Sequence, residues 1–198
     1  MTVHALSRRP RRAAPVVAPA PPVALAAGRL HELCGPARHS CALWIAGALE
    51  GPVLWIAPAW PGEGVNPCGM VRWADPGRLL FAAPKRPDDI LWCMEEALRS
   101  GAVPLVVAEL PELPGLTPVR RLHLAAGAAA QAPLGLILTP GDGGAPGVES
   151  RWHMAPAHEG EDRRWRLERR RARALPPRSW VLHERDGKRD LVPAGPEG

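Results

Sequence analysis

The sequence predicts an α/β protein with a mostly parallel sheet, helices on both faces of that sheet, and a small antiparallel C-terminal extension. Three observations predict this class. Residues 28–58 have the pattern of strand, glycine turn, helix and strand, which is one βαβ unit. Apolar runs and helical patterns then alternate as far as residue 139. Beyond residue 150, short segments alternate apolar with polar residues, which indicates antiparallel strands with one solvated face.

The βαβ unit begins with an extended run at residues 29–34. A glycine turn at 35–40 leads into a helix at 41–49 that is apolar on every side. A glycine and a proline then separate this helix from the next strand. Residues 53–57 are wholly apolar, which is typical of a strand buried on both faces of a parallel sheet. The turn at 35–40 therefore lies at the carboxyl edge of the predicted sheet, where open α/β folds bind their ligands.

The later elements follow from the same patterns. Residues 60–72 are rich in Gly and Pro and predict a loop with one helical turn near Val71. Asp88 and Asp89 favour a helix start, and the helix they begin ends before Gly101. The other expected strands and helix of the parallel part are, in order, strands at 78–83 and 103–108, a helix at 119–131 and a strand at 134–139. The strands expected in the extension are residues 151–154, 165–169 and 179–183.

Charge is unevenly divided along the chain, although the formal net charge is only +5. Residues 1–29 hold five Arg and no acid, and residues 163–189 hold eleven basic and three acidic groups. Between them, residues 30–162 hold nine basic and fifteen acidic groups. Basic ends of this kind suit nucleic acid or an acidic protein surface, and they also occur as solvated tails.

One domain with two tails is expected from a chain of 198 residues. We expect a disordered basic tail, rich in Pro and Ala, at residues 1–27. The domain is expected to span residues 28–190, and residues 191–198 are expected to form a flexible C-terminus. No apolar run approaches the roughly 20 residues of a membrane span, so no membrane contact is expected.

The four cysteines predict no metal site. They form no C-x-x-C pair, and no His lies at ligand spacing from them. Cys34, Cys41 and Cys93 lie in apolar segments, which is typical of small buried thiols in a reduced cytoplasmic protein.

Together these segments resemble the ImuA family of RecA-like inducible-mutagenesis proteins, which are sometimes described as SulA-like. The resemblance covers roughly residues 28–186 and depends on the order and spacing of short motifs. These motifs are GRLHEL at 28–33, PVLWI at 52–56, DDILW at 88–92, EEALRSGA at 95–102, RRLHLAA at 120–126, RW at 151–152, WRLE at 165–168, RAR at 171–173 and SW at 179–180. The resemblance implies a RecA-like core and a role in DNA-damage-induced mutagenic synthesis within the SOS response.

The resemblance also implies partners. One is an ImuB-like relative of Y-family polymerases, and another is an error-prone DNA polymerase III α subunit in the same assembly. RecA is a further expected partner, because a degenerate RecA core keeps the shape that meets other RecA cores. Contact with DNA is expected to be indirect.

The glycine turn lacks most of a phosphate-binding loop. A working P-loop has the pattern G-x-x-x-x-G-K-[ST], and here the second Gly and the Lys are absent. The residues that remain at the turn and, by the resemblance, at the Walker B position are Gly35, Pro36, Arg38, His39, Ser40 and Glu109. Without the Lys, and without a Glu after the third strand, the phosphates lack a point charge and the attacking water lacks an activator.

Two interpretations of this turn stay open. It forms a sharp βα turn beside a solvated strand end, which we favour, or it binds nucleotide without hydrolysis through Arg38 or His39. We therefore expect no catalytic residue and no cofactor. ATP binding by a divergent DNA-dependent ATPase is the alternative.

The loops that grip single-stranded DNA in RecA filaments correspond to residues 111–118 and 141–150. Neither contains Lys or Arg, and the second carries Asp142 and Glu149. Backbone binding needs cations to displace counterions, so these loops are poor DNA contacts.

A basic cluster near the C-terminal end is the stronger interaction candidate. Its members are Arg163, Arg164, Trp165, Arg166, Arg169, Arg170, Arg171 and Arg173. Arg binds phosphates and carboxylates through two parallel hydrogen bonds, and Trp adds stacking. By analogy with RecA-like filaments, Arg169 and Arg171 are candidates for an intersubunit or ImuB-facing contact. Three interpretations stay open: the cluster binds a protein partner, it binds a nucleic acid, or it only lines the solvated face of an edge strand.

The sequence thus predicts a non-catalytic RecA-like interaction protein of a translesion-synthesis assembly. The alternatives are a divergent DNA-dependent ATPase and a single-stranded DNA binder that uses the basic ends.

Overall fold

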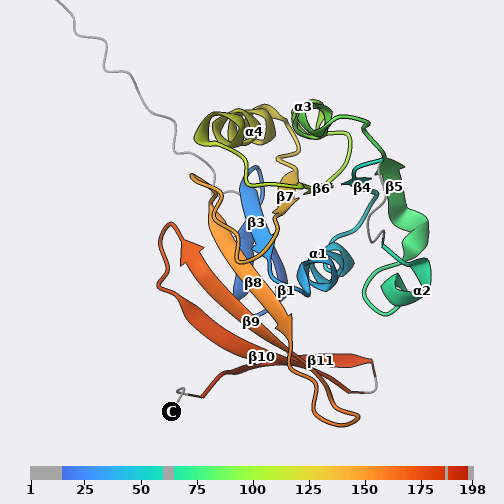
Figure 1. Ribbon diagram of the computed structural model, residues 1–198, viewed down its shortest axis with the longest axis vertical. Helices are drawn as coiled ribbons and strands as arrows, with labels where there is room; N and C mark the ends of the chain where they lie inside the picture. The colour runs from blue at the N-terminus through green and yellow to red at the C-terminus, as the bar shows by residue number, and fades with distance from the viewer. Residues whose placement is uncertain (1–14, 60–64, 186, 196–198) are drawn as a thin grey trace, which may run out of the picture.

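The computed structural model describes residues 15–59, 65–185 and 187–195 (Figure 1). The described strands are β1 (Val16–Ala20), β2 (Val23–Ala26), β3 (Leu30–Cys34), β4 (Val53–Ile56), β5 (Leu79–Ala82), β6 (Leu105–Glu109), β7 (Leu134–Leu138), β8 (Ser150–Pro156), β9 (Arg163–Ala172), β10 (Arg178–Arg185) and β11 (Lys188–Pro193). The described helices are α1 (Arg38–Gly47), α2 (Pro67–Met70), α3 (Pro87–Ser100) and α4 (Leu116–Ala128), with one 3-10 turn, η1 (Pro76–Arg78).

The central sheet confirms the predicted α/β class. In the described part of the chain its strand order is β11-β10-β9-β8-β3-β7-β6-β4-β5. The strands from β8 to β5 pair in parallel, and β9, β10 and β11 continue the sheet in antiparallel pairs. Helix α1 packs on one face of the parallel part, and α3 and α4 cover the other (Figure 1).

Alternate residues of the buried strands pack into two separate cores. On β6, Leu105 and Val107 face the core that contains α1, whereas Val106 and Ala108 face the core under α3 and α4. All four side chains are buried, which explains why residues 105–108 are apolar without interruption.

Helix α1 is enclosed on more than one side, in agreement with its apolar sequence. Its residues 41–46 are all buried. One side packs on β3, β7 and β8, and another side contacts β1. The hairpin of β1 and β2 therefore covers a surface of α1 that would otherwise be exposed.

The prediction of a disordered tail at residues 1–27 is wrong for residues 15–27. Strands β1 and β2 pair in antiparallel, and Val17, Val23 and Leu25 are buried in the same core as α1. In this Pro-rich segment buried and exposed residues alternate over a short stretch, and Val23 and Leu25 face inward. The prediction used the composition of the segment and did not take this alternation into account. Residues 1–14 lie outside the described residues.

The C-terminal boundary also differs from the prediction. Strand β11 runs to Pro193 and pairs with β10 from Arg185 to Trp180, so the sheet continues past residue 190. Strand β8 belongs to both parts of the sheet, because it is parallel to β3 and antiparallel to β9. In the described residues, no helix has the length and apolar character needed to cross a membrane.

Candidate functional site

Three backbone N–H groups of the turn at residues 35–40 donate to carbonyl oxygens of the chain itself. The turn joins β3 to α1, and Gly35 adopts a left-handed conformation with φ +87°. Gly35 N donates to Gly141 O at 2.9 Å, and Ala37 N donates to Met154 O at 2.9 Å. Pro36 has no N–H, and Arg38 N donates to Gly35 O at 3.2 Å. A phosphate at this turn would have to displace these bonds to reach the amides that a P-loop offers.

The side chain of His153 closes the same turn. A Cβ on Gly35 would lie 2.6 Å from His153 Nε2 and 2.6 Å from Met154 O. Glycine is therefore required here both by its positive φ and by the close approach of β8. This role of Gly35 agrees with the favoured interpretation of a sharp βα turn.

Substitution of Gly35 tests this close packing. We expect Gly35→Ala to lower the free energy of unfolding by about 3 kcal/mol or more, because it adds a steric clash to a left-handed alanine. Gly160→Ala is the matched control, since Gly160 has φ +57° and open space around its Cα, and we expect it to cost about 1 kcal/mol. Urea denaturation measures both losses, and equal losses would show that the turn has room for a side chain.

Two of the predicted site residues, His39 and Glu109, do meet at the carboxyl edge of the sheet. His39 Nε2 lies 3.1 Å from Glu109 Oε2. Trp55 Nε1 donates to the other carboxylate oxygen, Oε1, at 2.6 Å. Burial by itself would raise the pKa of Glu109, but the contacts with His39 and Trp55 outweigh it and lower that pKa overall. Glu109 thus links α1, β4 and β6 through its two oxygens.

The other turn residues do not form a phosphate cradle around this pair. The Arg38 guanidinium donates back to Gly35 O at 3.3 Å, within its own turn. Ser40 is half-buried on the first turn of α1. The geometry brings together a carboxylate, an imidazole and an indole, and the Arg38 guanidinium is bonded within its own turn.

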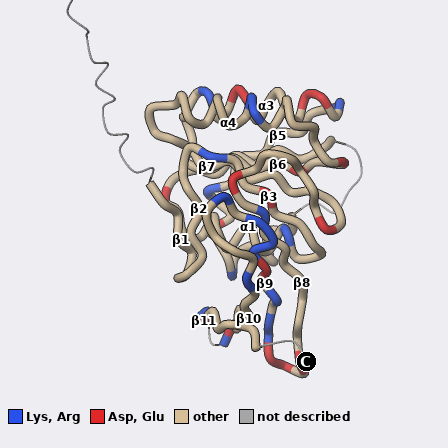
Figure 2. The backbone as a smooth tube through the Cα atoms, turned by 90° about the vertical axis from the view of Figure 1, so that its left-hand side faces the viewer, with Lys and Arg blue, Asp and Glu red and all other residues tan. Residues whose placement is uncertain are grey.

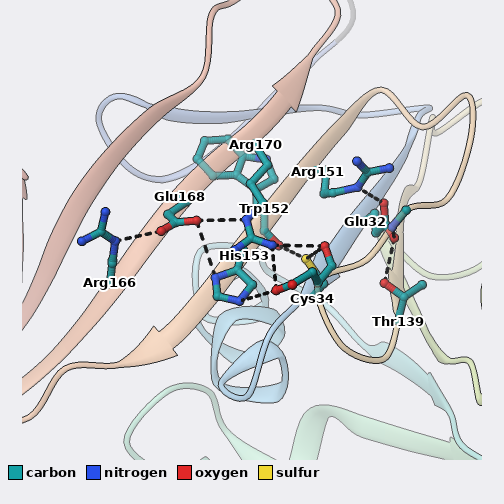
Figure 3. Close-up of polar contacts among 11 residues, drawn as sticks. Glu32, Cys34, Thr139, Arg151, Trp152, His153, Arg166, Glu168 and Arg170 are labelled. Carbon is teal, nitrogen blue, oxygen red and sulfur yellow. Dashed lines mark hydrogen bonds and ion pairs between the residues drawn. The ribbon is translucent and has the colours of Figure 1, made fainter. Parts of the chain in front are cut away.

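A buried carboxylate, Glu32, organises the loop at residues 141–150 (Figure 3). Glu32 on β3 is fully buried. Its Oε1 accepts from Thr139 Oγ1 at 2.8 Å, Gly144 N at 2.8 Å and Ala145 N at 3.0 Å. Its Oε2 accepts from Arg151 Nε at 2.5 Å. The loop at residues 141–150 is therefore held against the sheet.

Sequence reasoning did not identify Glu32. A signal was present, because a Glu in the middle of a short strand that is otherwise buried requires several hydrogen-bond donors. Those donors come from residues more than 100 positions away, so their identity depends on the strand order.

A second polar cluster surrounds His153 beside the turn (Figure 3). His153 Nε2 lies 3.6 Å from Asp142 Oδ1, and His153 Nδ1 lies 3.8 Å from Glu168 Oε2. Arg170 joins the two acids, with 2.9 Å to Asp142 Oδ1 and 2.9 Å to Glu168 Oε2. Burial, and then the charge of Arg170, lower the pKa of His153. A neutral imidazole near pH 7 follows from this environment.

Cys34, next to this cluster, is not an activated nucleophile. It is fully buried, and its Sγ lies 3.2 Å from Asp142 O and 3.5 Å from Trp152 O, either of which can accept the thiol hydrogen. Burial and the nearby Glu32 raise the pKa of the thiol to about 11. The burial and the raised pKa both disfavour the thiolate that Cys–His catalysis requires.

Most arginines of the predicted basic cluster are paired with acids. Figure 2 shows basic residues along β9 and acidic residues at the tip of the β8–β9 hairpin. The pairs are Arg163 with Glu184, Arg164 with Glu159 and Asp162, Arg166 with Glu168, Arg170 with Glu168 and Asp142, and Arg173 with Glu149. Arg171 is exposed, and no described acid pairs with it. The cluster is therefore less cationic than its sequence indicates.

Two members of the cluster are core residues, which corrects their assignment as partner contacts. Trp165 is buried and packs edge-on against Trp73, with ring centroids 4.9 Å apart. Arg169 is 6% exposed. Its guanidinium contacts the neighbouring rings of Trp152 and Trp180, 5.7 Å and 5.3 Å from their centroids. It also donates twice to Pro176 O, at 3.1 Å and 3.0 Å, so it is unsuited to contact a partner.

We therefore expect Arg169→Ala to lower stability. Loss of the stacking and of both bonds to Pro176 O predicts a decrease of about 2 kcal/mol in the free energy of unfolding. Arg171→Ala, on the same strand but exposed, is expected to stay within about 0.5 kcal/mol of the intact chain. Thermal denaturation of both variants checks the difference, and an Arg169 variant as stable as the Arg171 variant would contradict the structural role.

No protein-family model matches the chain, and no curated protein sequence matches it. Among residues 15–59, 65–185 and 187–195, no group of three or more His, Cys, Asp or Glu side chains is placed to hold a metal ion.

Proposed function

We propose that the chain is a RecA-like interaction protein that works without ATP hydrolysis. The α/β core, with its extended antiparallel edge, supports the RecA-like part of this proposal. Within that class, we assign the chain to the ImuA family, on the motifs between residues 28 and 186. Its proposed place is a cytoplasmic, damage-induced translesion-synthesis assembly, beside an ImuB-like polymerase relative and an error-prone DNA polymerase III α subunit, with RecA as a further partner.

One observation carries the non-catalytic part of the proposal. The amides of Gly35 and Ala37 are bonded to Gly141 O and Met154 O, and His153 fills the space over Gly35. A phosphate site depends on unpaired amides and a cation aimed at the phosphates. Here the chain itself occupies the amides of Gly35 and Ala37, and Glu109 is held by His39 and Trp55. A protein built in this way keeps the outer shape of a RecA-like core and lacks its nucleotide chemistry.

A capture experiment tests the proposal. The full chain is passed over immobilised ImuB-like protein, immobilised RecA, and blank resin, at about 150 mM salt, with and without Mg-ATP. Each arm is repeated after nuclease treatment, which removes capture through bridging DNA. We expect nuclease-resistant capture by the ImuB-like protein that is equal with and without Mg-ATP.

The other outcomes contradict the proposal. Capture that requires Mg-ATP would favour the divergent DNA-dependent ATPase. Capture abolished by nuclease would favour the single-stranded DNA binder. Capture by neither partner would remove the translesion-synthesis assignment.

A further inference from the structure

The two edges of the central sheet differ in character. Among the described residues the sheet ends at β11 on one side and at β5 on the other, and the only strand that pairs with β5 is β4. Strand β11 contains Lys188, Arg189 and Asp190, and charges of this kind keep an edge from pairing with another chain. Strand β5 has the sequence LLFA and carries no charge, so its edge lacks this protection (Figure 1).

Two large apolar side chains of β5 are exposed, one on each face of the sheet. Phe81, the only phenylalanine of the chain, is 60% exposed, and Leu80 is 52% exposed. On the neighbouring strand Trp55 is paired with Phe81 and is fully buried. Phe81 shares a face with Leu79, which belongs to the core around α1, whereas Leu80 lies on the face of α3 and α4. The exposure of β5 therefore follows from its position at the edge.

The strand is complementary to a second copy of itself. If two β5 strands pair in antiparallel about a two-fold axis through Phe81, the two Phe81 side chains lie opposite each other, and Leu80 of each copy lies opposite Ala82 of the other. An aromatic pair is favourable at such a position, and a large side chain fits beside a small one. Opposed residues lie on the same face, so this register also keeps the two faces of each sheet aligned.

The four charged residues nearest β5 in sequence agree with this pairing. Asp75 precedes the strand and Lys85 follows it, and both are exposed. Antiparallel pairing brings the beginning of each strand to the end of the other, so Asp75 of one copy lies on the side of Lys85 of the other. Arg78 donates to backbone carbonyl oxygens of its own chain, and Arg86 is paired with Asp89 at 2.6 Å.

We propose that two copies of the chain pair in antiparallel through β5, with Phe81 opposite Phe81, and so join their sheets across a two-fold axis. The strand is short and the interface is small, so the dissociation constant is expected to be about 1–100 µM. The homodimer uses no feature of the proposed translesion-synthesis assembly, and each proposal can therefore fail without the other.

Sedimentation equilibrium of the full chain between about 2 and 300 µM tests the proposal, and we expect a monomer–dimer equilibrium. Phe81→Lys and Phe81→Glu each place like charges opposite each other and remove the aromatic pair. We expect each variant to weaken association by at least about tenfold. An equal mixture of the two variants places Lys opposite Glu, and we expect it to associate at least about fivefold more tightly than either variant alone.

Leu124→Lys is the matched control, because it makes the same change from an apolar to a charged side chain. Leu124 is 73% exposed on α4, which packs over β3 and β7, and we expect this variant to associate like the intact chain. An intact chain that is monomeric up to about 300 µM would overturn the proposal. A dimer that Phe81→Lys leaves unchanged, or a mixture that associates no better than either variant alone, would also overturn it by placing the interface elsewhere.

Discussion

Glu32→Ala is expected to unfold the protein or to bring it close to unfolding. The substitution removes a buried carboxylate that holds four donors, from Thr139, Gly144, Ala145 and Arg151. The Arg151 side chain is 19% exposed and would lose its ion-pair partner. Breaking a buried ion pair from one side costs about 3–5 kcal/mol, which is a large part of the total stability of a domain.

Urea denaturation followed by Trp fluorescence measures this loss. Glu112→Ala is the matched control, because Glu112 is an exposed acid in the neighbouring loop and its removal is expected to cost less than about 0.5 kcal/mol. Glu32→Gln keeps the size and the acceptor oxygen and is expected to recover part of the lost stability. A Glu32→Ala variant as stable as the control would show that the loop at residues 141–150 is held by other contacts.

Deletion of residues 1–27 is expected to have the second large effect. It removes the β1–β2 hairpin, with the buried side chains of Val17, Val23 and Leu25, and exposes the surface of α1 that contacts β1. Burial of three such side chains contributes roughly 5 kcal/mol. For a domain of this size the melting temperature is expected to fall by about 10–20 °C.

The control for this deletion is a chain that lacks only residues 1–14. It keeps every described contact of the hairpin, so its melting temperature is expected to stay within about 2 °C of the intact chain. Differential scanning calorimetry on the three chains gives the comparison. If the chain without residues 1–27 has the same melting temperature as the intact chain, the hairpin does not stabilise the core.

The parallel part of the fold was predictable because its strands are buried on both faces. Runs such as residues 53–57 and 134–139 leave few alternatives to a central strand, and the structure has β4 and β7 there. The N-terminal hairpin was not predictable from composition, because its prolines and alanines are typical of disordered segments. What stabilises it is the apolar surface of α1, a tertiary contact that no local pattern shows.

The position of some residues of the candidate site could be predicted from the sequence. The contacts that close the turn could not. Sequence placed His39 and Glu109 at the carboxyl edge, where they do meet. The closure of the turn by His153 and Met154 depends on the pairing of β8 with β3, which is a long-range register. Arg169 could have been identified as a core residue, since period-2 alternation places it on the face of Trp165 and Leu167.

Calorimetric titration of Mg-ATP and Mg-ADP into the full chain tests most directly whether the turn at residues 35–40 is closed to phosphate. Because the chain itself uses the amides of Gly35 and Ala37, we expect no saturable binding of either nucleotide up to about 1 mM. Saturable binding with a micromolar dissociation constant that is lost in His39→Ala would contradict a non-catalytic interaction protein, and would assign His39 the role of the missing lysine.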